Sequence, residues 1–322
     1  MKILRVGDPH VTVRNLEESW KLIEFIQKVG KAREVDRIEF MGDLFHTHAV
    51  MRVEVVNFWH RAFEYLDFPI LALVGNHDQP GSKEKEQEMN ALQVYQDAFD
   101  HVRVVSAPFI NNGIVYAPYM SDKQKLIEKC NSFEGAKTLI AHETFTGAQY
   151  ENGFYAPDGV DPGLINIPVI ISGHIHKSQQ VGKCFYVGTP KWDSMSDANE
   201  DKGIWIFKHS EDGSVVSEDF VSTKEVLTPI YKYVMHEGFE EPELVDGGRH
   251  YIELNGKSSW IKKMVKKYKG KASIKAKPTD RKVTASITED STDIWQYLDN
   301  HFELDANTSK EAVKSFLKAV GL

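Results

Sequence analysis

The feature that most constrains this chain is an alternation of short apolar runs with amphipathic stretches across its first two thirds. Strands are predicted at residues 2–6, 37–41, 69–74, 137–141 and 168–172, and helical spacing of apolar residues marks 17–28, 52–66, 85–99 and 122–131. Further short strands at 113–117, 184–188 and 203–207 could form a second sheet. The pattern favours an α/β protein in which helices cover a mixed or parallel sheet.

Length and composition add few limits. The 322 residues suggest two or three domains, and 41% hydrophobic residues are typical of a globular protein. No stretch approaches the roughly 18 uninterrupted apolar residues of a membrane span, and the first residues run directly into a strand instead of a signal peptide. We therefore expect a cytosolic protein with no membrane partner. Cys130 and Cys184 are too few for a disulfide framework and are interpreted as packing residues.

The pattern changes after Phe207. The segment "HSEDGSVVSED" predicts a polar, turn-rich connection. A small α+β unit is predicted next, with strands near 229–236, 249–254 and 282–287 and a helix near 258–268, and two short amphipathic helices are predicted in the tail. The expected domains are residues 1–210, 225–287 and 290–322.

Charge is unevenly distributed along the chain. The formal net charge is −8, but residues 255–282 hold eleven lysines and arginines against one acid, Asp280, so this window carries +10 and the remainder −18. A concentrated basic segment in an acidic protein indicates a local contact with a polyanion. A solvated helix face is the alternative interpretation.

Polar side chains recur where the predicted strands end. They are Asp8 and His10 after the first strand, Asp43 and His46 after the second, Asn76, His77 and Asp78 after the third, His142 after a later one, and His174 and His176 after 168–172. Glycine precedes several of them, which suits tight turns and close backbone approach. Because ligand sites in open α/β sheets lie at the carboxyl ends of strands, we expect these residues to meet at one edge.

Imidazole nitrogens and carboxylate or amide oxygens are ligands for divalent metals. No cysteine is among them, which disfavours a structural zinc site and leaves Mn²⁺, Fe²⁺ or catalytic Zn²⁺. Seven candidate ligands are too many for one octahedral ion, so two ions that share a carboxylate fit better, with Asp43 as the natural bridge. Such a pair activates a hydroxide and neutralises charge in phosphate ester hydrolysis. The pattern therefore predicts a phosphoesterase.

The motifs D-x-H, G-D, G-N-H-D, a solitary His and G-H-x-H, in that order, resemble the calcineurin-like metallophosphoesterase superfamily over about residues 1–207. Leu44-Phe45-His46 and "VGTP" at 187–190 are similar to the SbcD-type nuclease subunit of bacteria and phages, and the short length is closer to a phage member. The resemblance implies a two-sheet sandwich flanked by helices, a small α+β capping domain and a C-terminal helical hairpin. It also implies the bacterial cytosol, or that of an infected host for a phage protein.

The resemblance further implies individual roles. One ion would be bound by Asp8, His10, Asp43 and His176, and the second by Asp43, Asn76, His142 and His174. His77 would lie beside the scissile phosphate and stabilise the transition state or protonate the leaving oxygen, with Asp78 available to orient its ring. His46 would help to place DNA for exonucleolytic cutting; a hydrogen-bonded loop histidine is the alternative.

As a whole, the resemblance implies a Mn²⁺-dependent nuclease, an exonuclease on duplex ends and an endonuclease on single strands, which uses a hydroxide activated by two metals. It would work with a coiled-coil SbcC-type ATPase in DNA end processing, recombination or replication. The DNA-binding candidates are Lys262, Lys263, Lys266, Lys267, Lys269 and Lys271. The partner-binding candidates are Trp295, Leu298, Phe302, Phe316 and Leu317. A homodimer is a further expectation, with Met51, Val55, Phe58 and Trp59 as the candidate face; a helix packed on its own sheet would show the same pattern and is the alternative.

Two other functions remain open from the sequence. A stand-alone phosphatase or small-molecule phosphodiesterase would need neither the basic window nor the helical tail, and would process a compact substrate faster than DNA. A catalytically silent DNA-binding scaffold is disfavoured because no expected metal ligand is missing from the chain.

Overall fold

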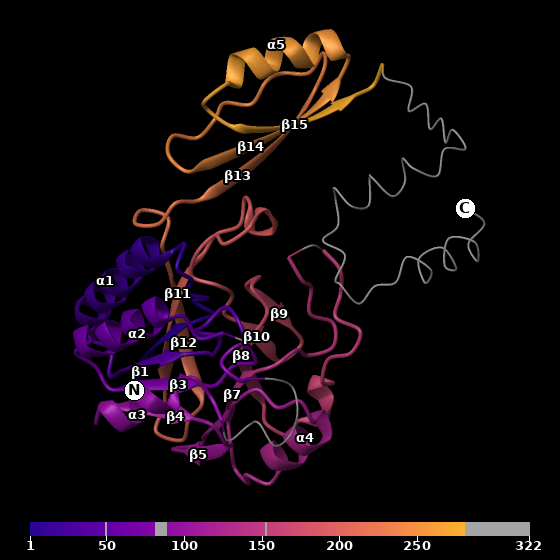
Figure 1. The fold of residues 1–322 in the computed structure, drawn as a ribbon. Helices are drawn as coiled ribbons and strands as arrows, with labels where there is room; N and C mark the ends of the chain where they lie inside the picture. Colours follow the sequence, from indigo (N-terminus) through magenta and orange to yellow (C-terminus); the bar gives the residue numbers. More distant parts are fainter. Residues whose placement is uncertain (49, 81–88, 152, 281–322) are drawn as a thin grey trace, which may run out of the picture.

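The computed structural model describes residues 1–48, 50–80, 89–151 and 153–280, and its main body is a sandwich of two mixed sheets (Figure 1). The first sheet has the order β12-β11-β1-β2-β3-β4. Its strands are β1 (Lys2–Val6), β2 (Arg37–Phe40), β3 (Ile70–Leu73), β4 (Val102–Val105), β11 (Gly203–His209) and β12 (Val215–Ser222). Strands β1 to β4 are parallel, while β11 and β12 extend the sheet antiparallel.

The second sheet repeats this plan with the order β5-β6-β7-β8-β10-β9. Its strands are β5 (Phe109–Asn111), β6 (Ile114–Ala117), β7 (Thr138–His142), β8 (Val169–Gly173), β9 (Gln179–Val181) and β10 (Cys184–Tyr186). The four central strands are parallel, and β5 and β9 pair antiparallel at the two edges. The predicted α/β class is present, and the second sheet contains the strands predicted at 113–117 and 184–188. The strand predicted at 203–207 is β11 of the first sheet instead, and the strands predicted at 137–141 and 168–172 belong to the second sheet.

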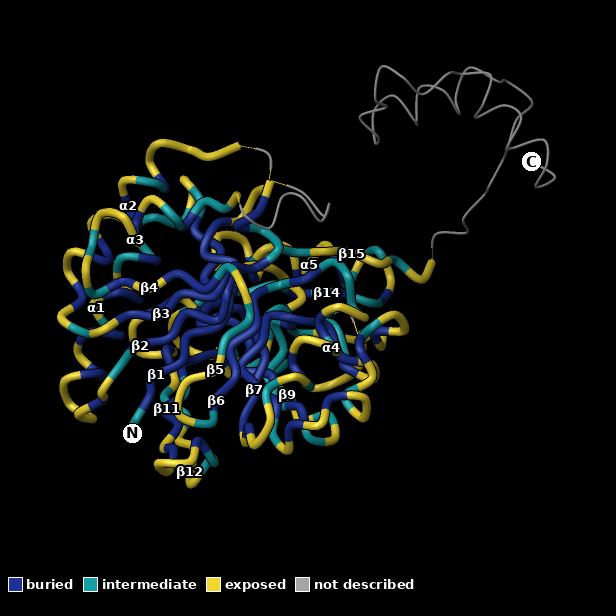
Figure 2. The backbone as a smooth tube through the Cα atoms, turned by 90° about the horizontal axis from the view of Figure 1, so that it is seen from below, coloured by how far each residue is buried: buried dark blue, intermediate teal, exposed yellow. Residues whose placement is uncertain are grey.

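Helices cover the outer faces of the sandwich. They are α1 (Leu16–Arg33), α2 (Val53–Tyr65), α3 (Gln93–Ala98) and α4 (Lys123–Asn131), with short 3₁₀ turns η2 (Pro162–Leu164) and η3 (Met195–Asp197). Apolar side chains of α1, α2 and α3 pack on the first sheet, and those of α4 pack on the second. Figure 2 shows the central strands of both sheets as the buried interior, whereas the edge strands β5, β9 and β12 are largely intermediate or exposed.

A buried ionic network crosses the layer between the two sheets. The Glu39 carboxylate accepts hydrogen bonds from the Arg5 guanidinium at 2.8 Å and from the hydroxyl of Tyr116, in the opposite sheet, at 2.8 Å. The Arg37 guanidinium lies 2.6 Å from the same carboxylate. Arg5 and Glu39 are fully buried, so each charge depends on the other for compensation.

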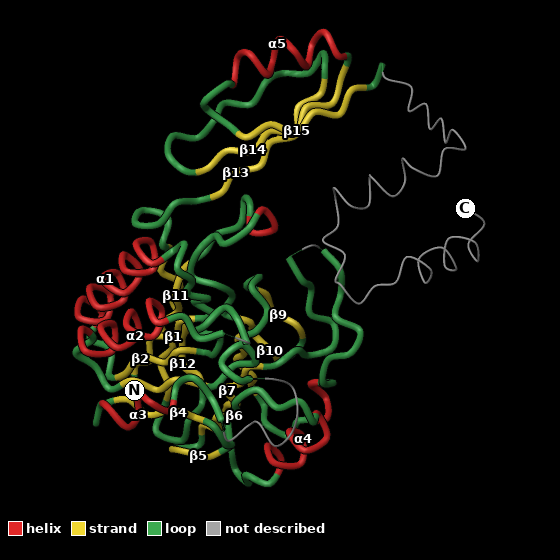
Figure 3. Tube along the Cα trace, viewed as in Figure 1, coloured by secondary structure: helices red, strands yellow, loops and turns green. Residues whose placement is uncertain are grey.

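A smaller unit follows the sandwich. Strands β13 (Ile230–His236), β14 (Arg249–Gly256) and β15 (Ser273–Pro278) form a parallel sheet, and α5 (Ser258–Tyr268) covers one face of it. Ile252 and Leu254 of β14 pack against Ile261 and Met264 of α5. Helix α5 lies on the face turned away from the rest of the chain (Figure 3). We call this segment, residues 230–278, the C-terminal unit.

Several predicted elements differ from the structure. The third strand of the C-terminal unit is β15, whereas the predicted strand 282–287 lies outside the described residues, as does the helical tail 290–322. The predicted helix 85–99 is represented by α3, and residues 81–88 are not described. The polar connection predicted after Phe207 is shorter than expected: residues 210–214 form a turn, but the residues after it form β12, which pairs with β11 as a hairpin. Strand β12 is an edge strand with mostly exposed residues, so its polar sequence hid it.

The face of α2 that was expected to support a homodimer is used within the chain. Val55, Phe58 and Trp59 are all buried in the core that α2 forms with the first sheet, whereas Met51 is 49% exposed. These three residues therefore contribute to folding and are unavailable for docking. Cys130 and Cys184 are buried and unpaired, in agreement with the packing interpretation. In the described part of the chain, every helix is too short or too polar to cross a bilayer.

Candidate metal centre

The predicted site residues meet at the carboxyl ends of β1, β2, β3, β7 and β8. Three groups of acid and imidazole side chains have donor atoms within 4.8 Å of one another in the described residues. They are Asp8, His10 and His176; His10, Asp43 and His77; and Asp43, His142 and His174. Positions 8 and 176 are the most distant in sequence, and the two sheets bring all of these residues together.

The first half of the centre is formed by Asp8, His10 and His176. The Nε2 atoms of His10 and His176 lie only 3.0 Å apart, so both ring nitrogens point at the same small volume. Asp8 and His10 are buried, and Asp8 Oδ2 and His10 Nδ1 have no hydrogen-bond partner within the described chain. Buried polar atoms are rarely left unpaired in proteins, so this convergence fits a bound cation.

The second half is formed by Asn76, His142 and His174. Asn76 Oδ1 lies 2.8 Å from His174 Nδ1 and 3.0 Å from His142 Nε2, and the two ring nitrogens are 3.2 Å apart. The Nδ1–H of His142 donates to the carbonyl of Met41 at 2.7 Å. This bond leaves Nε2 facing the centre, where its lone pair can bind a metal ion, an orientation typical of metal-binding histidines.

Asp43 links the two halves. Its Oδ2 lies 3.7 Å from His10 Nε2 on one side and 3.3 Å from His142 Nε2 on the other. Its Oδ1 accepts the backbone N–H of His77 at 2.8 Å, which fixes the carboxylate. Asp43 therefore lies between the two groups of side chains; its role as a shared ligand and the assignment of residues to two particular ions remain predictions.

Backbone strain is concentrated at this centre. His10, Asp43 and His174 have φ values of 41°, 51° and 75°, three of the six positive values among described non-glycine residues. Such conformations cost about 1 to 3 kcal/mol each and persist where the surroundings impose them. A Cβ on Gly42 would lie 2.2 Å from His142 Nδ1, and one on Gly75 would lie 2.2 Å from Asp43 Oδ1. Glycine is therefore required where these strands end, because ligands from other strands occupy that space.

His77 lies next to the metal centre with one ring nitrogen free to act. Its Nδ1 is 2.6 Å from the carbonyl of His46, so Nδ1–H donates there and Nε2 lies 4.0 Å from Asp43 Oδ2. Asp78 was expected to orient the His77 ring, but its carboxylate instead accepts hydrogen bonds from the backbone N–H groups of Phe45 and Gly75. Asp78 therefore joins two site loops, and the backbone of His46 orients the His77 ring.

The electrostatics of the centre suit a cation. Burial lowers the pKa of His174 to about 3 and holds the pKa of His10 well below its ordinary value, so both imidazoles are neutral donors at pH 7. Burial also raises the pKa of Asp8 to about 6. Burial opposes charge on His142, but Asp43 and Asp8 raise its pKa to about 10. The position beside His142 Nε2 therefore attracts positive charge strongly.

Three residues at the centre were missed by the sequence interpretation. The ring of His48 stacks on that of His77 with centroids 4.2 Å apart, and His48 Nδ1 lies 2.8 Å from the carbonyl of Asn76. Tyr119 stacks on His174, and Glu151 accepts the backbone N–H of His176. Tyr119 follows β6, another strand that ends at this edge, which is a signal the sequence does contain. His48 and Glu151 lie in loops with no motif.

Replacing His48 by alanine should slow the phosphate ester hydrolysis that the sequence predicts for this centre by up to about tenfold, because an aromatic pair contributes about 0.5 to 1.5 kcal/mol to holding its partner. His48→Phe keeps the stacking and should retain most of the rate. Turnover of bis(p-nitrophenyl) phosphate with Mn²⁺ measures both variants. Equal losses in the two variants would refute the stacking role.

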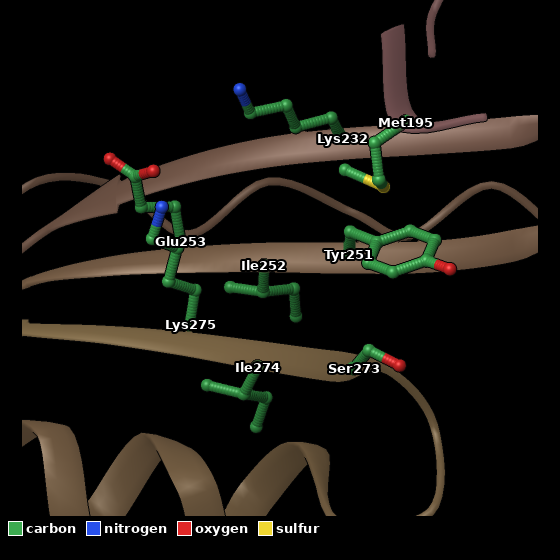
Figure 4. Close-up of a pocket in the computed structure, with 8 residues that line it drawn as sticks. All are labelled: Met195, Lys232, Tyr251, Ile252, Glu253, Ser273, Ile274 and Lys275. Carbon is green, nitrogen blue, oxygen red and sulfur yellow. The ribbon is translucent and has the colours of Figure 1, made fainter. Parts of the chain in front are cut away.

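The lysines predicted to bind DNA do not line the metal centre. Lys262, Lys263, Lys266 and Lys267 are exposed on α5, and Lys269 and Lys271 are exposed just after it. The opposite face of the small sheet carries a hollow of about 340 Å³, where Lys232 neighbours Tyr251, Lys275 neighbours Glu253, and Met195 of η3 reaches in (Figure 4). The basic window is therefore divided between two faces, and the α5 lysines point away from the centre.

The sandwich of mixed sheets and the cluster of imidazoles and carboxylates at its strand ends define a metal-dependent phosphoesterase. Residues 1–178, more than half of the chain, match the family Calcineurin-like phosphoesterase. The chain belongs to this family.

Three relatives give this membership more detail. The chain is 29% identical over 223 residues to "Putative phosphoesterase 244L" of Invertebrate iridescent virus 6, covering 64% of this chain and 75% of that protein. It is 28% identical over 194 residues to "Putative phosphoesterase 078R" of Invertebrate iridescent virus 3, covering 56% of this chain and 54% of that one. It is 23% identical over 227 residues to "Exonuclease subunit 1" of Enterobacteria phage T4, covering 64% of each.

Proposed function

We propose that this chain is the nuclease subunit of a DNA-processing complex and hydrolyses phosphodiester bonds at the Asp43 centre. The observation that carries the proposal is the convergence of two sets of donors on Asp43, with His77 beside them and free at Nε2. The similarity to the phage exonuclease subunit supports DNA as the substrate. That relative is named a subunit, which supports a partner for this chain, and we propose the coiled-coil SbcC-type ATPase that the family resemblance implies.

The residues of the centre fit two divalent cations, with Mn²⁺ proposed as the metal. Asp8, His10 and His176 would hold one and Asn76, His142 and His174 the other, with Asp43 shared. When bound, the two ions lower the pKa of an attacking water and neutralise charge on the phosphoryl group. The protein contributes the fixed positions of the donors, set by hydrogen bonds such as that from His142 to Met41.

His77 is proposed to act on the substrate directly. With Nδ1–H donating to the backbone of His46, Nε2 is directed toward the centre. A second proton on the ring, taken up at Nε2, would let this N–H stabilise the pentacoordinate phosphorus or pass to the leaving oxygen. Its ring is 27% exposed, so a substrate phosphate can reach it. His46 forms a triangle of rings with His10 and His77, whose centroids lie 5.2 and 5.9 Å from its own, in a position to contact the same substrate.

Cleavage of end-labelled linear duplex and single-stranded DNA by the purified chain tests the proposal. We expect degradation with Mn²⁺ and none with a chelator. His77→Ser should reduce it by about 10²- to 10⁴-fold, the usual contribution of a general acid, while bound metal stays at the wild-type level. His60→Ser, on the outer helix α2, is the matched control. Rapid hydrolysis of p-nitrophenyl phosphate beside intact DNA would instead indicate a phosphatase.

A further inference from the structure

A large cavity opens beside the metal centre where the C-terminal unit meets the sandwich. Its volume is about 750 Å³, within the range of ligand sites in proteins. His10 and His46 form the wall that it shares with the centre. Arg14 comes from the loop before α1, Arg52 from the start of α2 and Arg249 from the start of β14. Three distant parts of the sequence therefore each place an arginine around one cavity.

The positive charge of this cavity has little compensation inside the protein. Within the described chain, Arg14 forms no ion pair, and Arg249 donates to the neutral carbonyl of Trp192 at 2.6 Å. Arg52 pairs with Glu54 at 3.2 Å, but both side chains are about half exposed, and such surface pairs contribute little. The cavity therefore keeps guanidinium charge available for a ligand.

The two acidic side chains that line the cavity are already bonded to groups other than its arginines. Glu18 accepts the backbone N–H of Thr228 at 3.1 Å, and Asp193 pairs with the buried Lys191. Neither forms a salt bridge with the three arginines among the described residues. An anion that enters the cavity would therefore meet guanidinium groups that these carboxylates do not neutralise.

The loop that carries Arg14 is tied to the metal centre. Asn15 Nδ2 donates to the carbonyl of His10 at 3.1 Å, and its Oδ1 accepts the backbone N–H of Thr12 at 2.7 Å. Because His10 is a candidate metal ligand, this pair of bonds fixes the loop relative to the centre. Arg14 is thus held on a loop that is fixed beside the metal centre.

We propose that Arg14, Arg52 and Arg249 bind a second phosphate of the substrate, next along the strand from the phosphate at the metal centre. Guanidinium groups bind phosphate oxygens in pairs, which gives both charge and orientation. The cavity would then select a polynucleotide strand over a molecule with a single phosphate. This inference rests on the proposed function, since it assigns the neighbouring phosphate of the same DNA substrate.

Two measurements on the full chain test it. The first is the Kd of a fluorescein-labelled single-stranded oligonucleotide by anisotropy, in chelator so that no cleavage occurs, over a range of salt concentrations. The second is kcat/KM with Mn²⁺ on bis(p-nitrophenyl) phosphate, which has one phosphate. The variants are Arg14→Gln, Arg249→Gln and their double mutant. Arg33→Gln is the control, because Arg33 lies at the end of α1 and pairs with Asp219 of β12, away from the cavity.

We expect the double mutant to raise the oligonucleotide Kd by at least about tenfold. Each lost contact should also lower the steepness of log Kd against log salt concentration by about 0.7. Hydrolysis of the single-phosphate ester should stay within twofold of wild type, as should all properties of Arg33→Gln. An unchanged Kd in the double mutant, or no DNA binding by the wild-type chain, would overturn the inference. Arginine-dependent binding without any cleavage would instead contradict the proposed function and leave the second phosphate site standing.

Discussion

Replacing Asp43 by alanine should reduce phosphodiester hydrolysis by at least about 10³-fold, because this side chain is the proposed ligand of both ions, and the ions stabilise the charge that develops in the transition state. Its carboxylate lies within 4.0 Å of ring nitrogens in both halves of the centre. Loss of the shared ligand should also remove metal. Metal content after gel filtration and Mn²⁺-dependent turnover of bis(p-nitrophenyl) phosphate measure the two effects.

The matched control for this substitution is Asp67→Ala. Asp67 is also an aspartate with a nearby cation, but it is exposed and pairs with Lys31 on the surface. We expect Asp67→Ala to keep full activity and full metal content. Retention of more than a tenth of the activity by Asp43→Ala, with two metals still bound, would refute the bridging role.

Replacing Glu39 by glutamine should destabilise the fold by about 3 to 5 kcal/mol, because it leaves the buried charge of Arg5 without compensation. For a domain of this size the corresponding fall in Tm is about 10 °C. Calorimetry or circular dichroism measures it. Glu17→Gln, which breaks an exposed pair with Lys21, should change the Tm by a degree or two at most. A Glu39→Gln protein with the Tm of wild type would show that the network contributes nothing.

The difference in stability between wild type and Glu39→Gln should depend on pH, and its sign follows from the pKa of Glu39. Burial alone would raise the pKa of Glu39, but Arg5 and Arg37 hold it below its ordinary value. A carboxyl whose pKa is lowered by folding stabilises the protein above its unfolded pKa of about 4.3, and this contribution is lost as pH falls through the folded value. The stability gap between wild type and Glu39→Gln should therefore be complete at neutral pH and narrow in acid.

Much of the metal centre could be predicted because its information is local. A buried strand is visible in the sequence as an apolar run, and a glycine marks its end. The residue after this glycine is a candidate metal ligand, and parallel strands bring their carboxyl ends to one edge of a sheet. Asp8, Asp43, Asn76 and His174 all follow this rule. The family motifs then gave His77 a role that residue type alone could not.

The rest depended on contacts between distant residues. Strand β12 is polar because it is an exposed edge. The apolar face of α2 has the same sequence pattern whether it supports a dimer or packs on its own sheet, and only the structure shows that it packs on its own sheet. Nothing in the sequence around Arg5 or Tyr116 indicates that Glu39 joins them across the two sheets. Likewise, nothing in the sequence indicates that Arg14 and Arg249 are neighbours, and only the fold places them around one cavity.

Anomalous X-ray scattering from crystals grown with Mn²⁺ tests the central claim most directly. We expect two peaks, about 3.5 to 4 Å apart, with Asp43 between them. One should be bound by Asp8, His10 and His176 and the other by Asn76, His142 and His174. A single peak, or manganese bound away from Asp43, would contradict the account of this protein as a two-metal phosphodiesterase.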